Sequence, residues 1–232
     1  MIELDEFPTL VDPVMVAAFE GWNDAGDAAS GAIEHLRTVW DAQPLADLDS
    51  EDYYDYQVNR PHISVDETGV RSLTWPATRI YVARVPLFPR DIVLVQGIEP
   101  NMKWQQFARE ILGLAAELEV SMLVTMRALL SDTPHTRPVP GTGTTSDAAM
   151  GADLGLEPST YEGPTGIVGV LQDACARFGM SSVSLWAAVP HYVAQPPCPK
   201  ATLALLGVLE DLLETSIPLG DLPEDARAWE RG

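Results

Sequence analysis

The feature that most constrains the fold of this chain is a regular alternation of short apolar runs with stretches of helical periodicity. Residues 14–19 (VMVAAF) form a continuous apolar run between Pro13 and Gly21, which is typical of a strand buried on both faces of a sheet. Similar runs cover residues 79–85, 91–96, 121–126 and 183–189. We interpret these five runs as strands.

Helical stretches occupy most of the intervals between these runs. Apolar side chains recur at helical spacing in residues 25–40, 103–118, 167–178 and 201–213. Because neighbouring parallel strands need a long connection, usually a helix that crosses the sheet, this order favours parallel pairing. We therefore predict an α/β fold, with one three-layer α/β/α domain and a mainly parallel sheet.

The length of 232 residues fits a single domain that spans the whole chain. Residues 41–66 interrupt the alternation with acids and tyrosines, so we expect an insert there. Residues 131–146 (SDTPHTRPVPGTGTTS) predict a long surface loop. Residues from about 215 to 232 form a C-terminal tail beyond the last helical stretch.

The charge of the chain excludes several classes of partner. Its 34 acids outnumber its 14 lysines and arginines, which gives a formal net charge of −20 at pH 7. Such a chain is repelled by phosphate backbones and by anionic lipid, so we expect neither nucleic acid nor a membrane as a partner. The start MIELDEFPTL has no secretory-signal pattern, and no apolar run is long enough to span a bilayer. We expect a cytoplasmic protein.

No complete catalytic or cofactor motif is present. There is no phosphate-binding loop of the P-loop type, no nucleophile elbow and no metal-binding helix, and the four histidines show no ligand spacing. The stretch GTGTTS, residues 141–146, resembles half of a dinucleotide fingerprint but lacks the third glycine. Cys175 falls on an apolar helical face, and Cys198 lies in PPCP with no activating neighbour in the sequence. We expect no metal and no cofactor, and a non-enzymatic protein is favoured over an enzyme.

Polar residues follow several of the predicted strands. In a parallel sheet these loops gather at one edge, where open α/β sheets usually bind ligands. A ligand pocket there is therefore plausible, although no reaction follows from it. The candidate ligand-binding residues are Asn23, Asp24, Lys103, Arg137, Thr142 and Thr165.

Two turns at this edge have competing interpretations. In FEGWNDAGDAAS, residues 19–30, Glu20 and Asp24 form a conceivable acid/base pair, but Asn23 or Asp24 also suits the N-cap of the following helix. We favour the capping turn. In GPTG, residues 163–166, free N–H groups at a helix start would suit an anion, and a simple helix start is the favoured alternative.

An aromatic and acidic patch, DYYDYQVNRPHI, stands inside the predicted insert. Exposed tyrosines are enriched at protein interfaces, so Tyr53, Tyr54 and Tyr56 are candidate interface residues. Alternatively, the rings pack the insert onto the domain and leave their hydroxyls in water. The sequence does not separate these two interpretations.

Five of these segments occur together in one known family. EGWNDAGDAAS after the first strand, YYDYQVNRP, the PHTRP loop, YEGPTGIVGVL, and SLWAAVPHYV with the later PPCPKATLALL resemble the prokaryotic branch of the proteasome-assembly-chaperone family. The resemblance runs from about residue 14 to residue 213. It implies an α/β/α fold related to nucleoside-phosphorylase architecture, and self-association.

The resemblance also directs the expected function. Eukaryotic members are paired scaffolds on which proteasome α-subunits assemble, so we expect a homo-oligomeric assembly chaperone or scaffold with proteasome subunits as possible partners. Members that dock into proteasome rings often end in a hydrophobic-Tyr-any tail, whereas this chain ends AWERG, so docking through the C-terminus is not expected. The alternative is a small-molecule-binding protein or enzyme with its site at the carboxyl edge of the strands.

Overall fold

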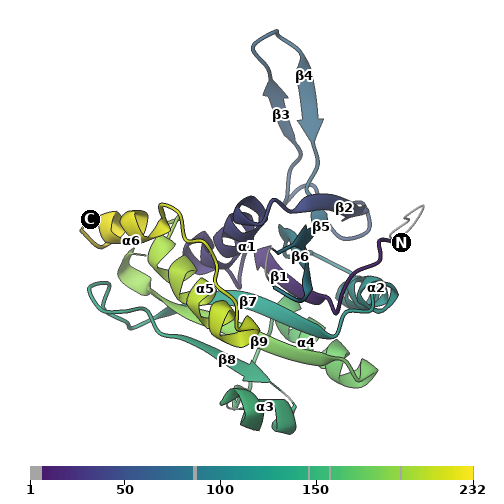
Figure 1. Cartoon of the computed structure of the whole chain (residues 1–232). Helices are drawn as coiled ribbons and strands as arrows, with labels where there is room; N and C mark the ends of the chain where they lie inside the picture. Colours follow the sequence, from purple (N-terminus) through teal and green to yellow (C-terminus); the bar gives the residue numbers. More distant parts are fainter. Residues whose placement is uncertain (1–6, 86–87, 146, 157, 194, 232) are drawn as a thin grey trace.

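The computed structural model describes residues 7–85, 88–145, 147–156, 158–193 and 195–231. Within these ranges, seven strands form the main sheet in the order β2–β5–β6–β1–β7–β9–β8 (Figure 1). The strands are β1 (Val14–Glu20), β2 (Gln43–Leu48), β5 (Thr78–Arg84), β6 (Asp91–Ile98), β7 (Met122–Ser131), β8 (Gly141–Thr145) and β9 (Ser181–Pro190).

The four central strands, β6, β1, β7 and β9, are parallel to one another. The outer strands are antiparallel: β5 pairs with β6, β2 pairs with β5, and β8 pairs with β9. A few residues separate β5 from β6, which is too short a connection for a crossover helix, and this explains their antiparallel pairing. The expected mainly parallel sheet is confirmed for the centre of the molecule.

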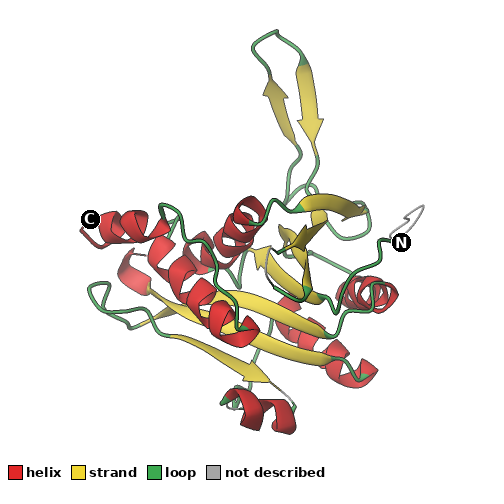
Figure 2. Ribbon diagram, viewed as in Figure 1, coloured by secondary structure: helices red, strands yellow, loops and turns green. Residues whose placement is uncertain are grey.

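Helices cover both faces of the sheet, which confirms the three-layer prediction (Figure 2). One face is covered by α1 (Ala28–Val39) and α5 (Pro199–Leu213), with α6 (Leu222–Arg231) packed against α5. The other face is covered by α2 (Trp104–Glu117) and α4 (Ile167–Phe178). The short helix α3 (Ala148–Leu154) lies beside β8.

Strand β1 lies at the centre of the sheet and contributes to two separate cores. Val14, Val16 and Ala18 pack toward α1 and α5, whereas Met15, Ala17 and Phe19 pack toward α2 and α4. All six side chains are fully buried. A strand between two helical layers has no solvent-facing side, and this is why its sequence is apolar without alternation.

A two-stranded hairpin stands apart from this body. In the part of the chain that the structure describes, strands β3 (His62–Val65) and β4 (Arg71–Thr74) pair only with each other, and they project away from the main sheet (Figure 1). Every residue of both strands is exposed. We refer to residues 60–75 as the projecting hairpin.

Three segments differ from the sequence-based expectation. The predicted surface loop 131–146 contains β8, and β7 continues to Ser131, because the main-chain groups of this stretch pair with β9. The predicted insert contains β2, which completes the sheet at its other edge. The tail contains α6, whose Trp229 packs against the core on the α5 side. No helix among the described residues has the length and apolar character needed to cross a membrane.

Candidate functional site

The turn from β1 to α1 is fixed by one buried carboxylate. Oδ1 of Asp24 accepts hydrogen bonds from the backbone N–H groups of Ala29 (2.6 Å) and Ser30 (3.2 Å), and its Oδ2 accepts one from the Ser30 hydroxyl (2.5 Å). Asp27, not Asn23 or Asp24, occupies the position directly before α1. A single 3₁₀ turn, Ala25–Asp27, carries the chain back so that the Asp24 carboxylate lies over the helix end. The predicted N-cap position of Asn23 or Asp24 is therefore wrong, but the Asp24 carboxylate does bind the start of α1 as a cap would, and it is not free for acid/base work.

Burial acts on both acids of this turn. It raises the pKa of Asp24, although the hydrogen bonds from Ser30 and Ala29 oppose that change. It also raises the pKa of Glu20, and the nearby charges of Asp24 and Asp27 add to the effect. The two carboxyls therefore disfavour a further negative charge at this turn.

A second carboxylate, that of Glu99, caps α4 at the same edge of the sheet. Oε1 of Glu99, which follows β6, accepts hydrogen bonds from Asn23 Nδ2 (2.9 Å) and from the backbone N–H of Ile167 (2.8 Å) at the start of α4. The helix start that the GPTG sequence offered to an external anion is thus occupied by the protein's own carboxylate. Gly166 has to be glycine here, since a Cβ atom would overlap the side chains of Asn23 and Glu99.

An open cavity of about 1170 Å³ lies beside this turn. We call it the Arg127 cavity, after the one charged side chain among its described lining residues. It is bounded by the β1–α1 turn, the carboxyl half of β7, strand β8, Trp186 of β9, and the loop before α4. It lies at the carboxyl edge of the parallel strands, where the sequence analysis expected a ligand.

Three of the six candidate ligand-binding residues line this cavity: Asn23, Thr142 and Thr165. The other three do not belong to it. Asp24 is buried beneath the turn as a helix cap. Lys103 forms an exposed ion pair with Asp52 (2.5 Å) at the start of α2, and Arg137 lies in the connection between β7 and β8. The structure therefore brings together half of the predicted set.

Arg127 was missed by the sequence analysis, which ended the strand at Met126. Its Nε atom is buried and has no hydrogen-bond partner among the described residues. Burial lowers the pKa of Arg127, although the nearby phenol of Tyr161 opposes that change. The signal that identifies it is a single charged residue inside a mostly apolar strand, VTMRALL.

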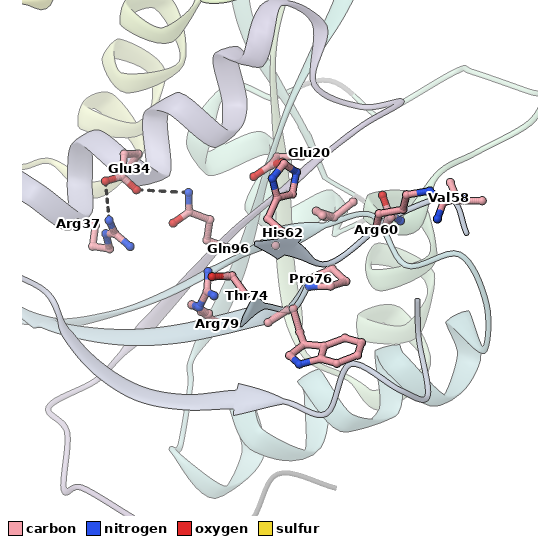
Figure 3. A pocket seen from close by; sticks show the side chains of 15 residues that line it. Glu20, Glu34, Arg37, Val58, Arg60, His62, Thr74, Pro76, Arg79 and Gln96 are labelled. Atoms are coloured by element: carbon pink, nitrogen blue, oxygen red, sulfur yellow. Dashed lines mark hydrogen bonds and ion pairs between the residues drawn. The ribbon is translucent and has the colours of Figure 1, made fainter. Parts of the chain in front are cut away.

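A second hollow, of about 670 Å³, lies on the other side of Glu20, at the base of the projecting hairpin (Figure 3). We call it the hairpin groove. Its lining mixes acids and bases: Glu20, Glu34, Arg37, Arg60 and Arg79 all contribute. Glu34 is already bound to Arg37 (2.6 Å) and to Gln96 (3.5 Å), so much of this charge is neutralised within the chain.

The three candidate interface tyrosines lie in different environments. Tyr53 and Tyr54 are 1% and 3% exposed, and both belong to the core on the α2 side. Tyr53 packs edge-on against Phe107, and the Tyr54 hydroxyl donates to the Ile98 carbonyl (2.9 Å). For these two rings the packing interpretation describes the ring contacts, but its expectation of hydroxyls in water does not hold for Tyr54, whose hydroxyl is bonded inside the chain. Tyr56 is half-buried and contacts Trp75 at the base of the projecting hairpin.

Neither a metal centre nor an exposed thiol is found in the described part of the chain. The described residues contain no group of three or more histidine, cysteine or acidic side chains placed to hold a metal ion. Both cysteines are buried, and burial raises the thiol pKa of Cys198 and raises that of Cys175 to about 11. What this edge offers chemically is binding through one cation, several hydroxyls and aromatic walls.

Comparison with known proteins gives strong matches in structure and sequence. A PAC2 family protein from Streptomyces avermitilis is 63% identical, with 95% of this chain and 94% of that chain covered and a TM-score of 0.92. A proteasome-assembly chaperone homologue from Mycobacterium tuberculosis is 55% identical, with 94% and 92% covered and a TM-score of 0.87. No curated protein gives a significant match.

A more distant likeness shows the fold alone. An archaeal proteasome activator from Pyrococcus furiosus is 19% identical, with 100% of this chain and 96% of that chain covered and a TM-score of 0.79. The expected relation to nucleoside phosphorylases is not addressed by these matches and stays a prediction. The sequence model of the PAC2 family matches residues 18–232. The chain therefore belongs to the PAC2 family.

Proposed function

We propose that this protein is a non-enzymatic assembly chaperone or scaffold of the cytoplasm, which self-associates and acts through protein surfaces. Its membership of the PAC2 family and its 55% identity to a proteasome-assembly chaperone homologue support a chaperone-like role. Proteasome subunits are the partners that this relationship suggests. The observation in the chain that carries the proposal is the projecting hairpin.

The projecting hairpin has one apolar and one polar face. The register pairs Ile63 with Leu73 and Val65 with Arg71, which places three exposed apolar side chains on one face. The opposite face carries two further cross-strand pairs, His62 with Thr74 and Ser64 with Ser72, and the two serine hydroxyls are 2.7 Å apart. A ribbon with one apolar face is expected to bury that face, yet neither face is covered by any of the described residues.

Two-stranded ribbons are at best marginally stable in water without a third strand or a helix to pack against. Contact with another chain would supply that packing. The partner we propose is a second copy of this chain, because the projecting hairpin carries two arginines and two acids and is neutral in a protein of net charge −20. A neutral contact surface lets acidic bodies associate with little repulsion.

Residues at the hairpin base extend this surface. Trp75 is exposed and contacts Tyr56, so the two rings continue the apolar face toward the body. Because Tyr56 contacts Trp75, we propose that it belongs to the interface. Tyr53 and Tyr54 act on it indirectly, through the packing of the segment that supports the hairpin.

The oligomeric state tests the self-association. We expect light scattering coupled to size exclusion to give a mass above that of one chain, and the double substitution Ile63→Ser with Leu73→Ser to reduce it. Phe178→Ser is the control, since Phe178 is an apolar side chain that is even more exposed but lies at the end of α4, in a different element. A monomeric wild-type protein, or a double variant that keeps its mass, contradicts the proposal.

Co-purification tests the chaperone role. A tagged full-length chain, expressed in its own cell, is expected to retain proteasome subunits, and the hairpin double variant to retain less of them if both activities use this surface. Retention of no proteasome subunit by an intact oligomer would remove the proteasome from the proposal and leave the self-association standing.

A further inference from the structure

Arg127 is a cation that the chain places at a cavity without giving it a partner. No hydrogen bond or ion pair of its guanidinium is found among the described residues, and its Nε atom is buried. A partly desolvated guanidinium without a partner is unfavourable, because the hydration lost at its buried Nε atom is not replaced. A ligand of opposite charge therefore gains the most binding energy by pairing with such a group in a cleft.

The charge of the residues that line the Arg127 cavity favours an anion as the ligand. The chain carries 34 acidic side chains, but none of the described residues that line the Arg127 cavity is acidic. Two acids of this edge are engaged elsewhere: Asp24 binds the start of α1, and Glu99 binds Asn23 and the start of α4. Among the described residues, no carboxylate forms an ion pair with Arg127, although the protein is strongly acidic.

The walls of the cavity add donors and an aromatic surface. Arg127 pairs in register with Trp186 of β9, and Trp186 pairs with Thr142 of β8, so the three lie in one row across the sheet. Alternation along the strands directs all three to the same face. Thr144 and Thr165 add hydroxyls, and Tyr161 adds a second aromatic side chain.

The row directly beneath is polar as well. Thr125 pairs with Ser184, each two residues before Arg127 and Trp186, and both hydroxyls are fully buried without a partner among the described residues. Unpartnered buried hydroxyls are uncommon, since each has lost water without gaining a hydrogen bond. The sheet under the cavity is thus polar over two rows, whereas the same strands are apolar on the opposite face.

We propose that the Arg127 cavity binds a small organic carboxylate with an aromatic or apolar body. The carboxylate takes a two-point hydrogen bond from the Arg127 guanidinium, which matches its planar geometry, and the threonine hydroxyls bind its remaining lone pairs. The body of the ligand lies against Trp186 and Tyr161. A nucleoside triphosphate does not fit this set, because one cation cannot balance several phosphate charges.

This site is independent of the self-association proposed above. The projecting hairpin contributes no residue to the Arg127 cavity, and the cavity contributes none to the hairpin. Loss of one activity therefore leaves the other measurable. The two proposals fail separately.

Titration of the full-length protein with benzoate tests the site, followed by tryptophan fluorescence and by ligand-observed NMR. We expect saturable binding of benzoate and none of benzyl alcohol, which has the same ring without the charge. Arg127→Met is expected to weaken binding by at least about tenfold, the effect of losing charged hydrogen bonds. Arg137→Met, an arginine that does not line the cavity, should bind as the wild type does.

A second variant keeps the test valid if Arg127→Met unfolds. Thr142→Val changes a wall of the cavity on an edge strand and is expected to weaken benzoate binding several-fold. Absence of saturable benzoate binding, equal binding of benzyl alcohol, or unchanged binding by a folded Arg127→Met protein would each overturn the proposal.

Discussion

Two polar regions lie side by side at the carboxyl edge of this sheet. They differ in whether their charged groups find hydrogen-bond partners within the chain. Around the β1–α1 turn, the carboxylates of Asp24 and Glu99 take up the free N–H groups of α1 and α4. Around the Arg127 cavity, the guanidinium and the hydroxyls of Thr125 and Ser184 have no partner within the described residues. The first region is complete without a ligand, and the second is not.

This difference distinguishes charged groups that stabilise the fold from charged groups that are available to a ligand, and it does not depend on any sequence motif. A charge whose hydrogen bonds are all made inside the chain stabilises the fold, and its removal destabilises the fold. A charge left without a partner lowers the stability of the fold, so we infer that its role is to bind a ligand or another molecule. The stability effects of substitutions in the two regions should therefore differ in sign.

The largest effect is expected at Gly166, in the complete region. Gly166→Ala places a methyl group against Asn23 and Glu99, and we expect a loss of about 3 kcal/mol in the free energy of unfolding. Gly113→Ala in the middle of α2 is the control, because a Cβ there meets nothing within 4 Å and the helix should gain up to about 1 kcal/mol. Urea unfolding at one fixed protein concentration measures both. Equal effects at the two glycines would contradict the tight packing described at α4.

Asp24→Ala is expected to cost somewhat less, about 2 kcal/mol, since it leaves three donors at the start of α1 without an acceptor. Asp147→Ala removes an exposed cap of α3, whose Oδ1 accepts from Ala149 and Met150, and should cost about 1 kcal/mol or less. The same urea experiment compares them. A larger loss at Asp147 than at Asp24 would show that burial does not strengthen the cap.

The smallest effect, with the opposite sign, is expected beneath the Arg127 cavity. Thr125→Val removes an unpartnered hydroxyl while keeping the volume of the side chain, and should raise stability by about 0.5–1 kcal/mol. Thr202→Val is the matched control, since that buried hydroxyl donates to the Ala28 carbonyl (3.2 Å) and its loss should lower stability. Thermal unfolding resolves the two signs. A destabilised Thr125→Val protein would show that the hydroxyl has a partner.

Much of this fold follows from local sequence patterns. The apolar runs and the helical spacing identify the central strands and four of the helices, because burial on two faces or on one leaves a direct pattern in the residue types. Of the outer strands, β5 was predicted as residues 79–85, whereas the edge strands β2 and β8 were missed. Strand β8, with the sequence GTGTT, is rich in glycine and threonine, and only its pairing with β9 distinguishes it from a loop.

The candidate site was predictable in position but not in composition. The rule that loops meet at the carboxyl edge placed Asn23, Thr142 and Thr165 together. It also included Lys103 and Arg137, because a sequence does not show where a long side chain finds its partner. Arg127 was missed for the converse reason: its importance comes from the register across β7, β9 and β8, which no local pattern contains.

The projecting hairpin has a consequence for how two copies of this acidic protein approach each other. From its base at Trp75 to its turn, an extended ribbon of eight residues reaches roughly 25 Å at about 3.3 Å per residue. Electrostatic repulsion in the cell fades over about 8 Å, the Debye length at physiological salt. The hairpin, which is neutral as a whole, therefore meets another molecule about three screening lengths before the charged bodies come together, so first contact is made where the repulsion between the bodies is already screened.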